Sequence, residues 1–246
     1  MKIGAVIQAR MGSTRLSGKV MKNLEGKTVL DHVIERVKQS KLIDEIIVAT
    51  TTDDRDSVIE LEALRRGVKA FRGSEDDVLS RYYYAAKEND LDIVIRITSD
   101  CPLIDSKVLD EIIQCYLKSD YEIVSNASSD LSNRTYPRGL DTEIFSFEIL
   151  ENTFNKAKEK YQREHVTPYI YEQSGHVFYY KNSIDYSKYR WTLDTAEDFK
   201  LISIIYKNLY HGKHDFYLSE IIELFEKNME LYDINAHVEQ KKIRNS

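Results

Sequence analysis

The chain has 246 residues, of which 42% are hydrophobic and 31% charged, with three prolines and nine glycines. This composition is typical of a folded globular protein and excludes a long disordered or low-complexity chain. The formal net charge of −6 excludes a protein that mainly coats nucleic acid, which needs a broadly basic surface, so any phosphate site must be a local basic patch.

The first half of the chain alternates short apolar runs with amphipathic stretches. Strands are predicted at 3–7, 46–51, 68–71, 92–98 and 121–126, and helices at 29–37, 58–64, 77–87 and 107–118. Continuous apolar runs are typical of parallel strands that are buried on both faces. The alternation therefore predicts a three-layer α/β fold with a mixed, mainly parallel sheet.

This alternation ends after residue 126. Residues 127–139 are polar and irregular, and residues 140–147 predict a strand that need not be parallel to the others. Further helices are predicted at 147–160, at 164–173, from about 195 and at 218–227, with a strand near 176–181. No Pro- or Gly-rich linker divides the chain. We therefore expect a single domain over residues 1–232, with insertions around 127–185, and a mobile tail at 233–246.

The cysteines, the amino terminus and the length of the apolar runs indicate where in the cell the protein is expected. Cys101 and Cys115 form no CxxC pair and complete no zinc motif, so we expect reduced structural thiols. The amino terminus enters an apolar run without the pattern of a signal peptide, and no apolar run approaches membrane-spanning length. These features predict a cytoplasmic protein that binds neither membrane nor nucleic acid.

A basic loop follows the first predicted strand. It carries Arg10, Arg15 and Lys19 together with glycine and serine, and it contains no acidic residue. A glycine-containing loop at the carboxyl end of a parallel strand is where open α/β sheets bind ligands. Neither a Walker motif nor a GxGxxG fingerprint is present. We expect the loop to bind phosphate through its cations, hydroxyls and amides, although a solvated connector has the same composition.

Two aspartates are candidate metal ligands. Asp100 follows the strand predicted at 92–98 and faces the same sheet edge as the basic loop, where carboxylates and triphosphate oxygens suit Mg²⁺. Asp105 is instead expected to cap the next helix. Thr195 can cap the helix that follows Asp194, which leaves the Asp194 carboxylate available. From spacing alone, metal ligand and helix cap stay equally open for Asp194.

Two further groups of residues are candidates for ligand binding. Gly73, Ser74 and Asp77 belong to a strand-to-helix turn at the same edge, where backbone amides suit a base or ribose, but an ordinary acidic helix start fits equally well. The second group mixes acids, arginine and histidine beside irregular backbone, which suits a polyhydroxylated or anionic acceptor. It comprises Arg138, Asp141, Glu143, Arg163 and His165.

Six segments in this order resemble the spore-coat polysaccharide cytidylyltransferase-like family, whose relatives include the acylneuraminate and 3-deoxy-manno-octulosonate cytidylyltransferases. They are IQARMGSTRLSGKV at 7–20, FRGSEDDVLSRYY at 71–83, RITSDCPLID at 96–105, YPRGLDTEIF at 136–145, REHVTPYIY at 163–171 and RWTLDT at 190–195. The resemblance covers most of the chain. It implies a Rossmann-like, GT-A-like nucleotidyltransferase fold and a homodimer formed through the inserted second half.

The resemblance also implies roles for single residues. Arg10, Ser13, Arg15 and Lys19 match the family's triphosphate signature. Asp100 and Asp194 look like the two carboxylates that hold catalytic Mg²⁺, and the turn at 73–77 looks like part of the nucleotide pocket. The expected nucleotide-binding residues are Gln8, Ala9, Arg10, Met11, Gly12, Ser13, Arg15, Lys19, Gly73, Ser74, Asp77 and Ser99.

The expected activity is transfer of CMP from CTP to a sugar-acid or phosphorylated sugar-like acceptor, with release of pyrophosphate, in surface polysaccharide or glycoconjugate biosynthesis. The expected catalytic residues are Arg10, Arg15, Lys19, Asp100 and Asp194. One alternative is a glycosyltransferase that uses a nucleotide-sugar, although it would release nucleoside diphosphate and need no grip on pyrophosphate. Another is a non-catalytic nucleotide-binding protein. The residues identify neither the acceptor nor cytosine over uracil.

Overall fold

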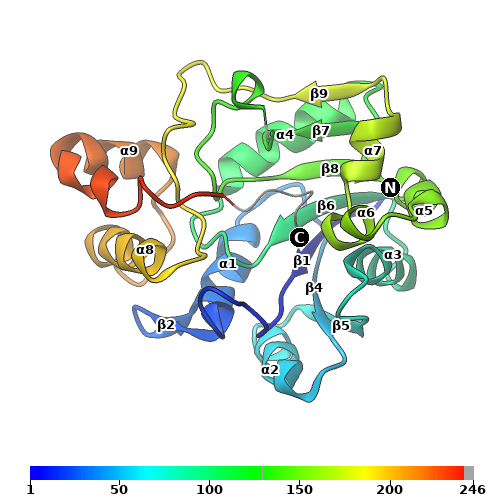
Figure 1. Cartoon of the computed structure of the whole chain (residues 1–246), viewed down its shortest axis with the longest axis horizontal. Helices are drawn as coiled ribbons and strands as arrows, with labels where there is room; N and C mark the ends of the chain where they lie inside the picture. The colour runs from blue at the N-terminus through cyan, green and yellow to red at the C-terminus, as the bar shows by residue number, and fades with distance from the viewer. Residues whose placement is uncertain (129, 241–246) are drawn as a thin grey trace.

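A computed structural model of the chain describes residues 1–128 and 130–240. Its centre is a seven-stranded sheet in the order β5-β4-β1-β6-β8-β7-β9 (Figure 1). The strands are β1 Ile3–Gln8, β4 Glu45–Thr51, β5 Lys69–Gly73, β6 Ile93–Thr98, β7 Ile123–Ser125, β8 Glu143–Ser146 and β9 Val177–Tyr179, and a separate hairpin pairs β2 Asn23–Leu24 with β3 Lys27–Thr28. Strand β8 is antiparallel to both of its neighbours, and every other pair in the large sheet is parallel. The predicted mixed, mainly parallel sheet is confirmed.

Helices follow the strands and cover the sheet. They are α1 Val29–Val37, α2 Ser57–Arg65, α3 Val78–Glu88, α4 Ser106–Leu117, α5 Phe147–Lys156, α6 Lys160–His165, α7 Pro168–Gln173, α8 Ala196–Leu209 and α9 Leu218–Lys227. Within residues 1–128 and 130–240, the short 3₁₀ helices are η1 Lys19–Met21, η2 Asp54–Asp56, η3 Leu131–Asn133 and η4 Met229–Ile234. Most elements predicted from periodicity are therefore present, with ends shifted by a few residues.

Side-chain alternation along β1 explains why the strand is apolar throughout. Ala5 and Ile7 belong to one buried cluster with residues of α1, α2, α4, α8 and α9. Val6 belongs to a second buried cluster with residues of α3, α5 and α7. Because successive side chains of a strand point to opposite faces, both faces of β1 are covered, which produces the three layers of Figure 1.

The second half differs from the prediction in one of its helices. The single helix expected at 164–173 is two helices, because the chain breaks at Val166, where φ is +72°. Pro168 then starts α7, and a proline suits the first turn of a helix but restricts the residue before it. The predicted mobile tail has a buried anchor: Asn235 is buried and donates to the Arg190 carbonyl at 2.9 Å, whereas Asp233, Ala236, His237, Glu239 and Gln240 are exposed. Mobility of the tail stays a prediction, and residues 241–246 lie outside the described part.

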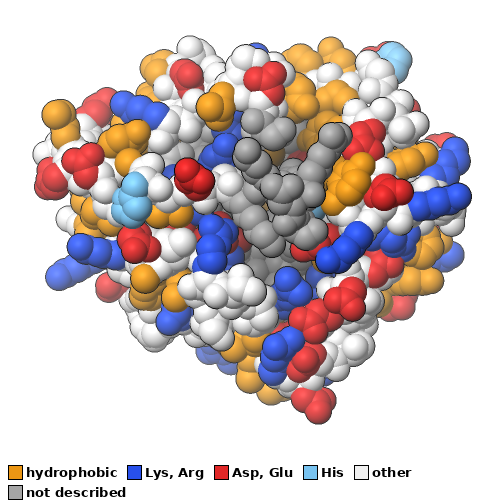
Figure 2. All heavy atoms as spheres, viewed as in Figure 1, with side chains coloured by type: hydrophobic (Ala, Val, Ile, Leu, Met, Phe, Trp, Pro, Cys, Tyr) orange, Lys and Arg blue, Asp and Glu red, His pale blue; other side chains and the backbone are white. Residues whose placement is uncertain are grey.

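The surface carries charges of both signs. On the coloured atoms of the face in Figure 2, Lys and Arg side chains are interspersed with Asp and Glu. Charges of both signs on this face fit a chain whose net charge is only moderately acidic. Among the described helices, none has both the length and the apolar character required to cross a membrane. Both cysteines are free thiols, as predicted.

Candidate active site

The carboxyl ends of β1 and β6 lie side by side and bring two predicted site segments together. Gln8 is in register with Thr98, and the Ser99 amide donates to the Gln8 carbonyl at 3.1 Å. The basic loop leaves β1 at this point, and Asp100 follows β6 directly. The predicted placement of the loop and Asp100 at one edge is therefore present in the structure, as expected for an open α/β sheet.

The basic loop is closed by its own backbone and anchored to the neighbouring strand. The Gly18 amide donates to the Met11 carbonyl at 3.1 Å, and Gly18 has φ +62°, a conformation that favours glycine. The Met11 amide donates to Asp56 Oδ1 at 2.7 Å, while the Thr51 hydroxyl binds the other oxygen of the same carboxylate. Asp56 is fully buried and is not singled out by the sequence, where it appears only as one of several acids after a strand.

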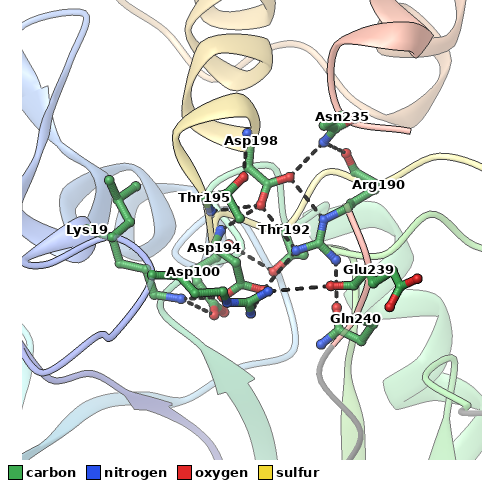
Figure 3. Close-up of polar contacts among 12 residues, drawn as sticks. Lys19, Asp100, Arg190, Thr192, Asp194, Thr195, Asp198, Asn235, Glu239 and Gln240 are labelled. Atoms are coloured by element: carbon green, nitrogen blue, oxygen red, sulfur yellow. Dashed lines mark hydrogen bonds and ion pairs between the residues drawn. The ribbon is translucent and has the colours of Figure 1, made fainter. Parts of the chain in front are cut away.

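Lys19 joins the two aspartates that the sequence places in separate motifs. Its Nζ donates to Asp100 Oδ2 at 2.7 Å and to Asp194 Oδ1 at 2.8 Å (Figure 3). The other oxygen of Asp194 accepts from Arg15 Nη2 and Arg190 Nη2, both at 2.9 Å. Residues from the basic loop, the end of β6 and the segment before α8 therefore converge on one point.

Electrostatics favour the charged forms of Lys19 and Asp100. Burial by itself lowers the pKa of Lys19, but the carboxylates of Asp100 and Asp194 raise it overall above its ordinary value. Burial likewise raises the pKa of Asp100, yet Lys19 and the Thr98 hydroxyl, 2.6 Å from Asp100 Oδ1, lower it overall. Opposite shifts of an acid and a base in contact are typical of an ion pair that is charged on both sides at neutral pH.

The segment before α8 supports Asp194 from behind. Asp198 accepts from the amides of Asp194 and Thr195 at 2.9 and 3.0 Å and from Arg190 Nε at 3.0 Å. The Thr195 hydroxyl caps α8 by accepting from the Asp198 amide. The capping role predicted for Thr195 is confirmed, and the Asp194 carboxylate is left to face Lys19. The sequence does not indicate that Arg190 and Asp198 hold Asp194, although Arg190 opens the RWTLDT segment.

The turn after β5 lies against the basic loop. Glu75 Oε1 accepts from Arg55 Nη2 at 2.7 Å and from Arg10 Nη1 at 3.4 Å. A Cβ on Gly12 would lie 3.3 Å from the same oxygen. Asp77 caps α3 by accepting from the Ser80 amide at 3.0 Å. The helix-capping role of this turn is therefore present, and the turn also forms one wall beside the loop expected to bind phosphate.

Arg163 lies away from the Asp194 cluster. Its Nε and Nη2 donate to Asp77 Oδ2 at 2.8 and 2.6 Å, and its Nη1 donates to the carbonyls of Phe154 and Ala157. The guanidinium ties α6, which ends at His165, to the start of α3. This differs from the predicted role in acceptor binding, because the charge and the donors of Arg163 are occupied within the protein.

Glu143 is also occupied by neighbouring side chains. This buried carboxylate accepts from Arg96 Nη1 at 2.5 Å, from the Thr167 hydroxyl at 2.9 Å and from the Tyr171 hydroxyl at 2.7 Å. The interactions fasten α7 to β6 and β8. Arg163 and Glu143, two of the five residues predicted to bind the acceptor, are therefore engaged with other groups of the protein, which the sequence pattern does not show.

Arg138 lies beside a cavity of about 220 Å³. Among the described residues, no carboxylate lies within ion-pair distance of Arg138, whereas nearby Asp141 pairs with Arg134 at 2.6 Å. Burial lowers the pKa of Arg138, the charge of Arg134 lowers it further, and the charge of Asp141 partly opposes this shift. Arg190 lines the same cavity and binds Asp194. A cation without an ion-pair partner among the described residues thus lines a cavity adjoining the carboxylate cluster.

Known proteins resemble the chain over almost its whole length. The sequence model of a family described as cytidylyltransferase matches residues 5–243. An uncharacterised protein of Methanocaldococcus jannaschii is 42% identical over 249 residues, covering 99% of this chain and 98% of that protein. The spore coat polysaccharide biosynthesis protein SpsF of Bacillus subtilis is 33% identical over 236 residues, covering 91% and 93%.

Solved structures share the architecture. A cytidylyltransferase from Leptospira borgpetersenii superposes with a TM-score of 0.88 at 38% identity, covering 98% of this chain and 99% of that one. A CMP:2-keto-3-deoxy-manno-octonic acid synthetase superposes with a TM-score of 0.66 at 20% identity, covering 85% and 100%, which supports the nucleotidyltransferase fold. The match of the family model over residues 5–243, together with these relatives, shows that the chain belongs to the cytidylyltransferase family.

Proposed function

We propose that the chain transfers CMP from CTP to a sugar-acid or phosphorylated sugar-like acceptor and releases pyrophosphate. The observation that carries the proposal is the convergence of Lys19 and Arg15, both from the basic loop, on the carboxylates of Asp100 and Asp194. A phosphate-binding loop beside paired carboxylates is suited to breaking a bond within a triphosphate. The name of the Bacillus subtilis relative supports a role in polysaccharide biosynthesis.

The reaction moves negative charge toward the basic loop. An oxygen of the acceptor attacks the α-phosphorus, the bond from that phosphorus to the bridging oxygen breaks, and pyrophosphate leaves with the bond's electrons. Arg10, Arg15 and Lys19 would stabilise the charge that develops on the departing phosphates. Asp56 would hold the loop in place through its bond to the Met11 amide. Position and charge, rather than a covalent enzyme intermediate, would lower the barrier.

The residues present fit a divalent cation. Asp100 and Asp194 each direct an oxygen at the same ammonium group, which makes an oxygen-only pair of the kind that Mg²⁺ prefers. Within the described ranges, no group of three or more His, Cys, Asp and Glu is assembled for a metal, so phosphate oxygens and water would complete the coordination. When bound, Mg²⁺ would offset negative charge on the reacting phosphate.

Arg138 supports an anionic acceptor. Its guanidinium is partly buried beside the 220 Å³ cavity and has no carboxylate partner among the described residues. A carboxylate or phosphate on the acceptor would neutralise it with a charge-assisted hydrogen bond. Replacing Arg138 with Gln should then raise the acceptor KM at least tenfold while leaving the KM for CTP within about twofold.

A screen of pyrophosphate release tests the proposal. Four nucleoside triphosphates are crossed with sugar acids, aminosugars and phosphorylated polyols in the presence of Mg²⁺. Release with CTP and one acceptor class is expected. Stronger release with UTP would contradict the assignment of the base, free nucleoside diphosphate from a nucleotide-sugar would indicate a glycosyltransferase, and CTP binding without turnover would indicate a non-catalytic protein.

Assembly and location also belong to this proposal. We expect residues 1–232 to form one domain, and the insertions around 127–185 to form a homodimer in the cytoplasm. Size-exclusion chromatography with light scattering measures the assembly directly. A monomer at micromolar concentration would contradict it.

A further inference from the structure

The carboxylate cluster is electrically balanced without a metal. Its members are linked by ion pairs of 2.7 to 3.0 Å. Three are acids and three are bases: Asp100, Asp194 and Asp198 against Arg15, Lys19 and Arg190. A divalent cation added to this set would leave two uncompensated positive charges in a partly buried place, which is unfavourable unless a cation leaves or an anion enters.

The oxygens that would bind a metal already have donors. Asp100 Oδ1 accepts from the Thr98 hydroxyl and Oδ2 from Lys19. Asp194 Oδ1 accepts from Lys19, and its Oδ2 accepts from two guanidinium groups. Lys19 Nζ bonds to one oxygen of each carboxylate, so a metal that bridged the two carboxylates through these oxygens would compete for the same place. The Lys19 side chain is only 12% exposed, and solvent screens the competition little.

Of the two less exposed cations that contact Asp194, Lys19 is better placed to move than Arg190. Lys19 follows the αL residue Gly18, at the end of a loop whose residues 13–15 are partly or fully exposed. Arg190, by contrast, is buried and is also held by Asp198 through two bonds of 3.0 and 3.1 Å. Phosphate oxygens offer Lys19 an alternative partner of the same charge sign as the carboxylates.

We infer that Lys19 occupies the metal position in the free protein and gives it up when a triphosphate binds, so that divalent cation and triphosphate bind cooperatively. The inference rests on the proposed function for the identity of the triphosphate. Its physical basis is an exchange of partners: the ammonium group moves from two carboxylates to phosphate, and the freed carboxylates accept the cation. Because coupling of this kind is reciprocal, the cation also strengthens triphosphate binding.

Binding of Mn²⁺ alone tests the exchange without catalysis. Electron paramagnetic resonance of unbound Mn²⁺ measures its dissociation constant for the wild type, Lys19→Met and Lys22→Met. We expect Lys19→Met to bind Mn²⁺ at least tenfold more tightly than the wild type. Lys22→Met should not, because it removes a positive charge close in the chain that makes no ion pair with Asp100 or Asp194 among the described residues. Adding Asp100→Asn to Lys19→Met should abolish the gain.

Wild-type protein provides a second measurement, which remains informative even if Lys19→Met does not fold. Addition of α,β-methylene-CTP should lower the dissociation constant of Mn²⁺ for the protein at least tenfold, after subtraction of the Mn²⁺ that the free analogue binds. In Lys19→Met this coupling should be smaller. Equal Mn²⁺ affinity of folded Lys19→Met and wild type, or no coupling in the wild type, would overturn the inference. Neither result would alter the pyrophosphate screen, so a failure of the proposed function is detected separately.

Discussion

Two groups of paired charges tie distant segments of this chain together, and they differ in which element carries the cation. At the sheet edge, Arg15 reaches Asp194 from the basic loop, and Lys19 reaches Asp100 and Asp194 from the end of that loop, at the start of η1. Under α7, Arg96 reaches Glu143 from within β6, and two hydroxyls complete the same carboxylate. A cation beside an exposed loop can exchange its partner for a ligand, whereas Arg96 is paired with a carboxylate that Thr167 and Tyr171 also hold. Similar ion pairs would therefore serve as the proposed site in one region, whereas in the other they hold α7 against β6 and β8.

The largest expected effect is on stability and concerns the Arg96–Glu143 pair under α7. Glu143→Ala leaves the Arg96 guanidinium buried without its carboxylate, and removal of one partner of a buried pair costs about 3–5 kcal/mol. Urea unfolding should show this loss, while pyrophosphate release by the folded fraction stays close to wild type. Glu148→Ala, at an exposed position of α5, is the control and should change stability by about 0.5 kcal/mol or less. A loss of activity without a loss of stability would contradict the distinction between the two regions.

The next effect is on the reaction and concerns the site. Asp100→Asn removes a negative charge beside Lys19 and should reduce kcat for pyrophosphate release about 10²–10³-fold, equivalent to about 2.7–4 kcal/mol in the barrier. Unfolding should change far less. Asp105→Asn is the matched control, because Asp105 caps α4 and Asn is also a good cap. Equal loss of activity in both variants would remove the special role of Asp100.

The buried pair His32–His214 gives a smaller effect, which is a dependence of the free energy of unfolding on pH. His32 and His214 share a bond of 2.7 Å between His32 Nδ1 and His214 Nε2, and His32 Nε2 donates to the Leu24 carbonyl, so one proton on each ring is sufficient for both bonds. Burial lowers the pKa of His32 to about 4 and that of His214 to about 3, the latter also through His32. Below pH 6.5 the unfolded chain binds these protons and the folded chain does not, so stability is complete above pH 6.5 and declines toward pH 4.

Urea unfolding at pH 7.5 and 5.5 measures this decline. The expected loss is about 2 kcal/mol, since each histidine contributes on the order of 1 kcal/mol over that interval. His214→Gln should flatten the dependence on pH, whereas the exposed His211 serves as a control whose replacement by Gln should not. A dependence that survives His214→Gln unchanged would place its origin elsewhere.

The smallest effect concerns the loop itself. Gly18→Ala forces alanine into φ +62°, at a cost of about 1 kcal/mol, and should raise the KM for CTP several-fold because Lys19 and Arg15 lose their position. Gly26 also has a positive φ, and a Cβ added there would meet no atom of the described residues within 4 Å. Gly26→Ala should therefore cost similar stability without a change in KM. A parallel rise of KM in both variants would show that general destabilisation, and not loop position, is responsible.

Local sequence patterns are sufficient to predict features that depend on short-range interactions. The Thr195 cap of α8 and the Asp105 cap of α4 both follow from the sequence, because a cap bonds to amides two or three residues away. The break between α6 and α7 at Val166 does not follow from the sequence, because the apolar residues keep a helical spacing across it. The sequence also does not show that Arg163 binds Asp77 and that Glu143 binds Arg96, because these partners lie 86 and 47 residues away along the chain.

The sequence by itself determined the α/β alternation, the local basic patch in an acidic chain and the resemblance to cytidylyltransferases, because apolar period and loop composition are local properties. Only the tertiary structure decided that Lys19 lies between Asp100 and Asp194, which are 81 and 175 residues away along the chain. It also decided which charged residues are neutralised inside the protein and that Arg138 faces a cavity. Ion pairing depends on distance in space, and folding alone brings such remote side chains together.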